Sequence, residues 1–277
     1  MQTVLLTSIP PVANNAQFEE RISYQRRCIR SWIATGHLPK SLNPEHEIAD
    51  LVQLFPEVDF HPAYRSTAPI NHRPLVYVSD LIALGLEDSS ERLAICNADV
   101  FFEPLVPFTS GLPNELPIAY SNRVDIERFA EVRTRKTFYG IDYVNMSKAF
   151  AIDLPDCVFA LGLPWWDYWL PLEAIRKGII PFNLKWDTAP LLHHLIHGDR
   201  WDPASLVYLG RHLINLTSLG FDASNTNLYE FQINWQIFNE QFVGERVNPT
   251  AQIFARIARD LCSHISENSA MHDFKPQ

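Results

Sequence analysis

The stretch ERLAICNADVFF, residues 91–102, begins with two charged residues and continues with an apolar segment. Its carboxylate Asp99 comes shortly before two phenylalanines. An apolar run this short predicts a buried strand. Asn97 and Asp99 stand at its carboxyl end, where the two-residue period of a strand sends both side chains to one side and Ala98 to the other. This pair either caps a turn or binds a cation, because Asn and Asp favour turns and their oxygens also suit Mg²⁺ and similar ions.

Segments around this strand alternate between strand and helix patterns. Residues 4–9 predict a first buried strand, and apolar residues at helical spacing predict a helix over residues 17–35. Further helix patterns begin at Pro74 and near Pro164, and β patterns cover residues 118–126, 137–146 and 179–184. This alternation predicts a mostly parallel, three-layer α/β/α (Rossmann-like) sheet with a helical C-terminal region, in which ligands bind beyond the carboxyl ends of the strands.

The last third of the chain carries helix patterns. An aromatic face repeats at three and four residues through Leu228, Phe231, Trp235, Phe238 and Phe242, and Asn248-Pro249 predicts the start of another helix. The aromatic face predicts intramolecular core or, as the alternative, a homo-oligomer contact. We expect a catalytic core over residues 1–202, a helical extension packed on it over residues 203–267, and a loose tail over residues 268–277.

Bulk composition narrows the function classes. The 277 residues carry a net charge of −9, which argues against nucleic acid as the main partner. The 4 cysteines are scattered without a CxxC pair, which favours free thiols in a reducing compartment. The N-terminal residues show no basic leader, and no stretch approaches the ~20 apolar residues of a membrane span, so we expect a cytoplasmic protein.

A second chemistry-bearing stretch is LGLPWWDYW, residues 161–169. It places Asp167 in the first turn of a helix, where the helix dipole favours a carboxylate. One interpretation is a general base beside a sugar-stacking wall of Trp165, Trp166 and Trp169. The alternative is a helix-start aspartate beside core tryptophans. Because two adjacent tryptophans do not easily both face the core, we expect at least one to line a cleft.

The third stretch, LLHHLIHGDRWD, places His193, His194 and His197 within five residues, followed by two aspartates. Imidazole nitrogens suit a divalent cation, so one of these histidines is a candidate metal ligand, although a single histidine is more often structural. On the helix after the first strand, the polar face carries Arg21, Arg26, Arg27 and Arg30. This face is either simply solvated or, at Arg27, in contact with a bound cofactor.

The ordered set of motifs resembles bacterial glycosyltransferases of the GT-A type, whose fold binds nucleoside-diphosphate sugars. The resemblance covers roughly residues 3–200 and rests on TVLLTSIPP, QRRCIRSWIATG, EVDFHPA, RPLVYVSDLIAL, ICNADVFF, YGIDYVNM, LGLPWWDYWL and LLHHLIHGD. It is closest to bacterial glycosyltransferase-like proteins that carry N-A-D-I and G-R-P-G-W-D-N-W stretches.

This resemblance implies a site for each part of the reaction. The nucleotide sugar would bind around Thr7, Ser8 and Ile9, with Asn97, Ala98 and Asp99 matching the D-x-D motif that holds Mn²⁺ or Mg²⁺ against the diphosphate. Asp167 would match the acidic residue that deprotonates the acceptor hydroxyl in inverting members. His194 or His197 would match the late histidine that completes the metal shell. The partners implied are a nucleoside-diphosphate sugar and a hydroxyl acceptor.

Two positions depart from the family pattern. Asn97 is neutral where the first aspartate of D-x-D is usual, which puts metal dependence in question. Trp165 places bulk where the P-G-W form has glycine, which predicts a different acceptor pocket.

Two other functions remain open. A sugar-phosphate nucleotidyltransferase would make the activated sugar rather than use it, but the loop TSIPPVANNAQ lacks the glycines and lysine of such enzymes. A catalytically inactive GT-A-like binding protein is the other alternative, and Asn97 favours it.

Overall fold

The computed structural model describes residues 2–12, 17–68, 73–102, 112, 115–126, 136–186, 192–195, 203–217 and 251–274. In chain order the elements are β1 (Thr3–Thr7), α1 (Phe18–Ala34), β2 (His37–Asn43), α2 (Glu45–Leu54), β3 (Asp59–Pro62), α4 (Val78–Glu87), β4 (Arg92–Cys96), β5 (Val100–Phe102), β6 (Ile118–Ile126), β7 (Lys136–Ser147), α5 (Lys148–Ala151), α6 (Trp166–Arg176), β8 (Phe182–Trp186), β9 (Leu192–Leu195), α7 (Pro203–Thr217), α9 (Ala251–Glu267) and β10 (Ala270–Phe274).

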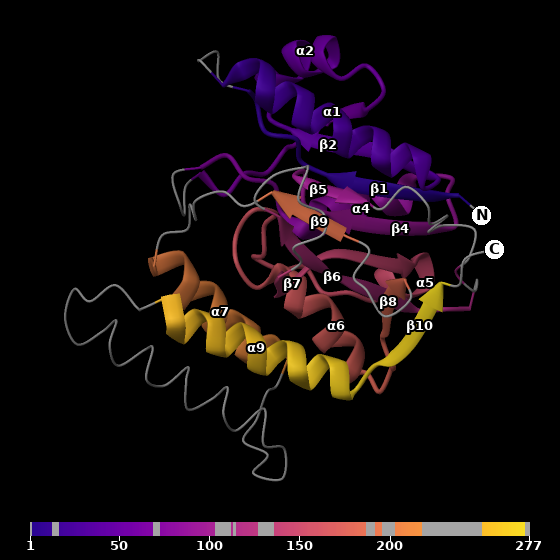
Figure 1. Cartoon of the computed structure of the whole chain (residues 1–277), viewed down its shortest axis with the longest axis vertical. Helices are drawn as coiled ribbons and strands as arrows, with labels where there is room; N and C mark the ends of the chain where they lie inside the picture. The colour runs from indigo at the N-terminus through magenta and orange to yellow at the C-terminus, as the bar shows by residue number, and fades with distance from the viewer. Residues whose placement is uncertain are drawn as a thin grey trace.

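The strands form a single mixed sheet in the order β10-β8-β6-β7-β4-β1-β2-β3, with β9 paired to β5 and β6. Most pairs are parallel, but β7 runs antiparallel to both β4 and β6, and β5 runs antiparallel to β9. The predicted mostly parallel α/β sheet is therefore confirmed. Figure 1 shows this sheet between α1 and α2 on one side and α6, α7 and α9 on the other.

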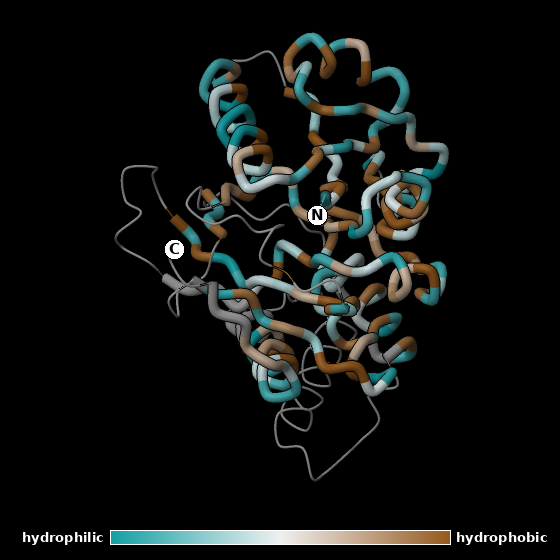
Figure 2. Tube along the Cα trace, turned by 90° about the vertical axis from the view of Figure 1, so that its right-hand side faces the viewer, coloured by the Kyte–Doolittle hydropathy of each residue, from teal (hydrophilic) through white to brown (hydrophobic). Residues whose placement is uncertain are grey.

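The two faces of the sheet bury alternate residues of the same strands. On β1, Val4 and Leu6 pack in the cluster that contains α4, α6, α7 and α9, whereas Leu5 packs in the cluster with α1 and α2. This alternation is the two-residue period of a strand with both faces covered. Along the helices, hydrophilic and hydrophobic segments alternate, as expected where one side packs on the core (Figure 2).

Strand β2 is absent from the sequence-based interpretation. Its residues HLPKSLN include Pro39 and buried polar side chains, so neither an apolar run nor a clean alternation marks it as a strand. Pro39 is tolerated because pairing with β3 begins only at Lys40, which leaves Pro39 next to β1 alone.

The loose tail predicted from residue 268 is wrong for residues 270–274. These residues form β10, which pairs in parallel with β8 at the edge of the sheet. The physical reason is that β8 has main-chain groups to pair on that edge, and Ala270 also donates its N–H to the Pro181 carbonyl at 2.9 Å. α7 and α9 share one hydrophobic cluster with the sheet. The aromatic face of residues 228–242 lies outside the described residues, and the domain boundaries stay a prediction.

None of the helices in the described part of the chain combines the length and hydropathy that a membrane crossing requires. All four cysteines are buried, and none of them is in a disulfide bond.

Candidate active site

The Asn97–Asp99 turn joins β4 to β5 at the carboxyl edge of the sheet, and helix α1 holds it from one side. Gln25 donates to the Ala98 carbonyl at 2.8 Å, and the Tyr24 hydroxyl donates to the Asp99 carbonyl. The same hydroxyl accepts the Leu195 N–H at 3.2 Å, so Tyr24 links this turn to β9. These bonds use the main-chain groups of residues 98 and 99, which form a turn instead of continuing the strand, and Ala98 is buried in the cluster that contains α1.

Asn97 meets Asp142 of β7 through two hydrogen bonds. Its main-chain N–H donates to the Asp142 carbonyl at 3.2 Å, and its amide donates to the Asp142 carboxylate at 2.5 Å. The other oxygen of that carboxylate accepts from Arg123 of β6, also at 2.5 Å. Asp142 is only 3% exposed, and a carboxylate this buried requires such paired donors.

Arg123 also binds Asp125, with 2.9 Å between Nε and Oδ1. Two residues apart on β6, they lie on one face of the strand, and the guanidinium therefore reaches both Asp125 and Asp142. Burial alone would lower the pKa of Arg123, but the two carboxylates raise it above its ordinary value. Arg123 is thus a permanent cation inside the site.

His194 of β9 lies between two carboxylates. Its Nδ1 is 3.1 Å from Asp125, and its Nε2 is 3.4 Å from Asp99. Burial opposes the charged imidazole, but the hydrogen bonds to Asp125 and Asp99 outweigh it and raise the pKa of His194 to about 9. Near neutral pH the ring is therefore an imidazolium that donates from both nitrogens.

Asp167 lies in the first turn of α6, next to β7. Its carboxylate accepts the Ile141 N–H at 3.3 Å, which places it beside the residue that precedes Asp142. Burial, and next the charge of Asp142, raise the pKa of Asp167 to about 7. The residue as a whole is half-buried. A carboxylate with these properties is half ionised at neutral pH and can take a proton from a bound hydroxyl.

The tryptophans beside Asp167 do not form a sugar-stacking wall. Trp165, Trp166 and Trp169 are all at most 3% exposed, so the prediction that one of them lines a cleft is wrong. Both adjacent rings are buried because Trp165 adopts a left-handed backbone with φ of 78°, which turns the chain sharply at the start of α6. This is the position at which the P-G-W form has glycine, the residue that adopts such a φ most easily.

The predicted nucleotide residues after β1 are held by the protein itself. The Thr7 hydroxyl donates to the Cys96 carbonyl at 2.8 Å. The Ile9 N–H donates to Ser41 Oγ at 2.9 Å, and the Ile9 carbonyl accepts from Asn43 at 2.8 Å. Ser8 is half-buried between them. These bonds shape the loop at the carboxyl end of β1, and a role of the loop in binding a nucleotide stays a prediction.

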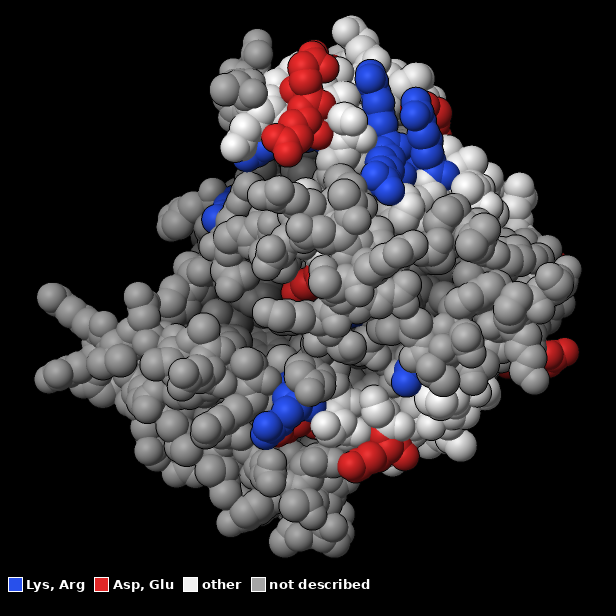
Figure 3. Space-filling view, viewed as in Figure 1, with Lys and Arg blue, Asp and Glu red and all other residues white. Residues whose placement is uncertain are grey.

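Arg27 is exposed on α1, and its guanidinium lies 4.9 Å from the centre of the Phe101 ring. Basic side chains stand out over α1 on the face shown in Figure 3. Phe101 follows Asp99 by two residues, so Arg27 lies near the predicted site. Its contact with a cofactor stays a prediction.

The donor atoms at this site do not fit a metal ion as they stand. Both nitrogens of His194 face carboxylates, so neither is open to a metal ion. Within the described residues, no group of three or more His, Cys, Asp or Glu is arranged to hold a metal. His197 lies outside the described residues, so its part in binding Mn²⁺ or Mg²⁺ stays a prediction.

Sequence reasoning missed Arg123, Asp125 and Asp142. Two signals were available: a charged pair at alternate positions in IAYSNRVDI, and a lone aspartate in the apolar YGIDYVNM. A buried strand carries such charges only where partners exist, which marks them as candidates for a site.

No protein-family model matches the sequence, and no curated protein matches it. Among solved structures, HddC from Yersinia pseudotuberculosis is 14% identical with a TM-score of 0.36, over 60% of this chain and 84% of that one. The inositol-1-phosphate CTP transferase from T. maritima is 13% identical with a TM-score of 0.39, over 80% of this chain and 98% of that one. At TM-scores below 0.5, these likenesses carry no argument about what this chain does.

Proposed function

We propose that this chain is a transferase that binds a nucleoside-diphosphate sugar at the carboxyl edge of β1 and β4 and moves the sugar to a hydroxyl acceptor. The observation that supports it most is Asp167, a half-buried residue whose carboxyl pKa of about 7 is raised by burial beside the Asn97–Asp142–Arg123 cluster. A base whose pKa lies near the working pH is the most effective at taking a proton in the transition state.

In this proposal the acceptor hydroxyl attacks the anomeric carbon while Asp167 takes its proton. The bond from that carbon to the diphosphate oxygen breaks, and the nucleoside diphosphate leaves with the bonding electrons. Arg123 and His194 offset two of the three charges of Asp99, Asp125 and Asp142, which leaves this cluster with one net negative charge. In this proposal the diphosphate therefore binds on the α1 side of the site, where the exposed Arg27 supplies a further positive charge. No step of this scheme requires a metal ion.

The second candidate is transfer of a nucleotidyl group to a sugar phosphate. Phosphate-binding loops present free main-chain N–H groups to the phosphates. Here the Ile9 N–H is bonded to Ser41, and residues 7–17 contain neither glycine nor lysine. These features favour glycosyl transfer. A third candidate, an inactive nucleotide-sugar binding protein, would retain the cluster without turnover.

One assay separates the three candidates. The purified full-length chain is incubated with UDP-, GDP-, CDP-, ADP- and dTDP-sugars, and separately with nucleoside triphosphates plus sugar 1-phosphates. Release of a nucleoside diphosphate that the Asp167→Asn variant lacks supports glycosyl transfer. Release of pyrophosphate identifies nucleotidyl transfer instead. Binding that raises the melting temperature without either product identifies the binding protein.

A further inference from the structure

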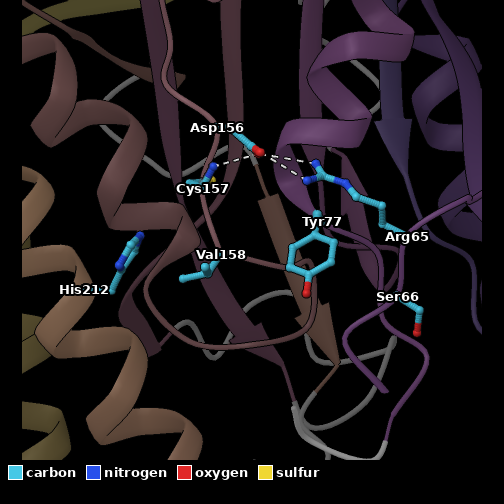
Figure 4. A pocket seen from close by; sticks show the side chains of 7 residues that line it. All are labelled: Arg65, Ser66, Tyr77, Asp156, Cys157, Val158 and His212. Carbon is cyan, nitrogen blue, oxygen red and sulfur yellow. Dashed lines mark hydrogen bonds and ion pairs between the residues drawn. The ribbon is translucent and has the colours of Figure 1, made fainter. Parts of the chain in front are cut away.

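A separate cavity of about 440 Å³ lies away from the carboxylate cluster, and its residues come from three parts of the chain. Arg65, Ser66 and Tyr77 belong to the connection from β3 to α4, and Asp156, Cys157 and Val158 belong to the connection from α5 to α6. His212 of α7 forms the opposite wall (Figure 4). The volume lies within the range of about 300–1,000 Å³ that small-molecule pockets occupy.

One wall of this cavity is built around Arg65. The guanidinium binds Asp80 at the start of α4, and it donates to Ser79 at 2.8 Å and to Asp156 at 3.1 Å. It also lies 5.1 Å from the centre of the Tyr77 ring. These contacts join the two connections, so the groups that line the cavity are held in place.

The charge at this wall disfavours an anion. One guanidinium is paired with two carboxylates, and the bond from Arg65 keeps the pKa of Asp156 below its ordinary value, so Asp156 is ionised near neutral pH. The local sum is therefore one negative charge. A phosphate or a nucleotide would meet net repulsion here.

The opposite wall of the cavity carries the imidazole ring of His212. His212 Nε2 is buried and has no hydrogen-bond partner among the described residues. Burial lowers the pKa of His212, so the ring is neutral near pH 7. A buried polar atom without a partner is costly, and a ligand hydroxyl can satisfy a neutral imidazole as donor or acceptor.

A further aromatic side chain, Tyr208, lies on the same helix as His212. Tyr208 lies one turn before His212 on the same side of α7, and it is 50% exposed. It lines a smaller neighbouring cavity that shares Val158 with the first. Tyrosine rings beside hydroxyl, imidazole and carboxylate groups suit a ligand that has apolar C–H faces and several hydroxyls.

We propose that this cavity binds a neutral sugar ring, with hydroxyl groups on Asp156, Ser66 and His212 and its C–H face on tyrosine. A purely apolar ligand would leave the buried His212 Nε2 without the hydrogen bond that a sugar hydroxyl can supply. None of the lining residues belongs to the cluster around Asn97, Arg123 and His194, so the inference stands independently of the proposed reaction.

The test uses imidazole ¹H–¹³C NMR spectra of the full-length protein, in which His212→Gln identifies the His212 cross-peak among those of 10 histidines. The probes are methyl α-glucoside, methyl α-galactoside and methyl α-mannoside, with inorganic phosphate as the anionic comparison. We expect at least one glycoside to shift the His212 cross-peak with saturation, while phosphate does not.

Asp156→Asn, which removes the acceptor charge, is expected to weaken this binding at least several-fold. Asp153→Asn is the matched control, because Asp153 is exposed in the same connection but does not line the cavity. Melting temperatures establish that both variants fold. The proposal is overturned if no glycoside shifts His212, if phosphate saturates the shift, or if the two variants bind the glycoside equally.

Discussion

The Asn97 amide donates a hydrogen bond to the Asp142 carboxylate, with 2.5 Å between Nδ2 and Oδ1. The residues meet because β4 and β7 pair antiparallel, with Cys96 opposite Tyr143. A neutral amide suits position 97, since a carboxylate there would face that of Asp142 at hydrogen-bond distance. The carboxylate beside position 97 is therefore supplied by Asp142 of the neighbouring strand β7.

Replacing Asn97 by aspartate tests this relationship. Two carboxylates in contact cannot both be ionised cheaply, so we expect Asn97→Asp to lower the free energy of unfolding by about 1–3 kcal/mol at pH 8 and by less at pH 5. Urea denaturation measures the change. The exchanged pair, Asn97→Asp with Asp142→Asn, should recover at least half of the loss. Wild-type stability of the single variant at pH 8 would contradict the role of Asn97.

Asp167→Asn is expected to reduce sugar transfer by about 10²–10⁴-fold, because an amide cannot take the acceptor proton. In the wild type, the rate should rise with pH through an apparent pKa of about 7. The measurement is the initial rate of nucleoside diphosphate release between pH 5 and pH 9. A variant that retains the wild-type rate and pH profile would remove Asp167 from the reaction.

The same variant should be more stable than the wild type above pH 7. The folded pKa of Asp167, about 7, lies above its ordinary value of 3.8, so the folded state holds a proton that the unfolded state has lost. The stability that this group contributes is therefore complete below about pH 4 and is lost as the pH rises to 7. Thermal unfolding of both proteins at pH 5 and pH 8 checks that the stability of the variant relative to the wild type is higher at pH 8 than at pH 5.

We expect the free energy of unfolding to fall at higher pH as His194 loses its proton. Its pKa of about 9 in the folded state lies above the ordinary 6.5, so its contribution is complete below pH 6.5 and disappears as the pH rises through 9. The loss is roughly 3 kcal/mol at most. Urea midpoints of wild type and His194→Gln between pH 6 and pH 9.5 should converge as the pH rises. A constant difference across that range would show that His194 is not charged when folded.

Trp165 combines an unfavourable backbone conformation with a buried ring. Comparing the Trp165→Gly variant with the Trp165→Phe variant separates the two effects. Trp165→Gly relieves a left-handed backbone worth about 1–2 kcal/mol and removes an indole worth about 3–5 kcal/mol. We expect a net loss of roughly 1–4 kcal/mol in urea denaturation. Trp165→Phe, which keeps a ring, should lose less. A glycine variant as stable as the wild type would mean that the ring does not stabilise the fold.

Mn²⁺ tests whether residues outside the described part of the chain complete a metal site. If they do, calorimetry with a nucleotide sugar should show tighter binding with Mn²⁺ than without, and Asp99→Ala should abolish that difference. Equal affinity with and without Mn²⁺ in the wild type would remove the metal from the site.

Local patterns predicted much of the architecture. The apolar run of residues 92–96 corresponds to β4, and the helical spacing of residues 17–35 corresponds to α1. Both could be predicted because each element buries side chains that recur at a regular spacing in the sequence. β2 and β10 were missed because their pairing partners, rather than their own periodicity, make them strands.

The candidate site also has some features that the sequence predicted and others that only the tertiary structure decides. Asn97, Asp99 and Asp167 could be predicted from the sequence as candidate site residues, because each polar residue follows a strand or begins a helix. The ionisation states and hydrogen-bond partners of these residues could not be predicted from the sequence. Only the tertiary structure brings Asp142 to Asn97, places Arg123 between two carboxylates and encloses His194 between Asp99 and Asp125. The reason is that pKa and charge pairing depend on burial and on neighbours distant in the chain, whereas strand and helix periods depend on residues a few positions apart.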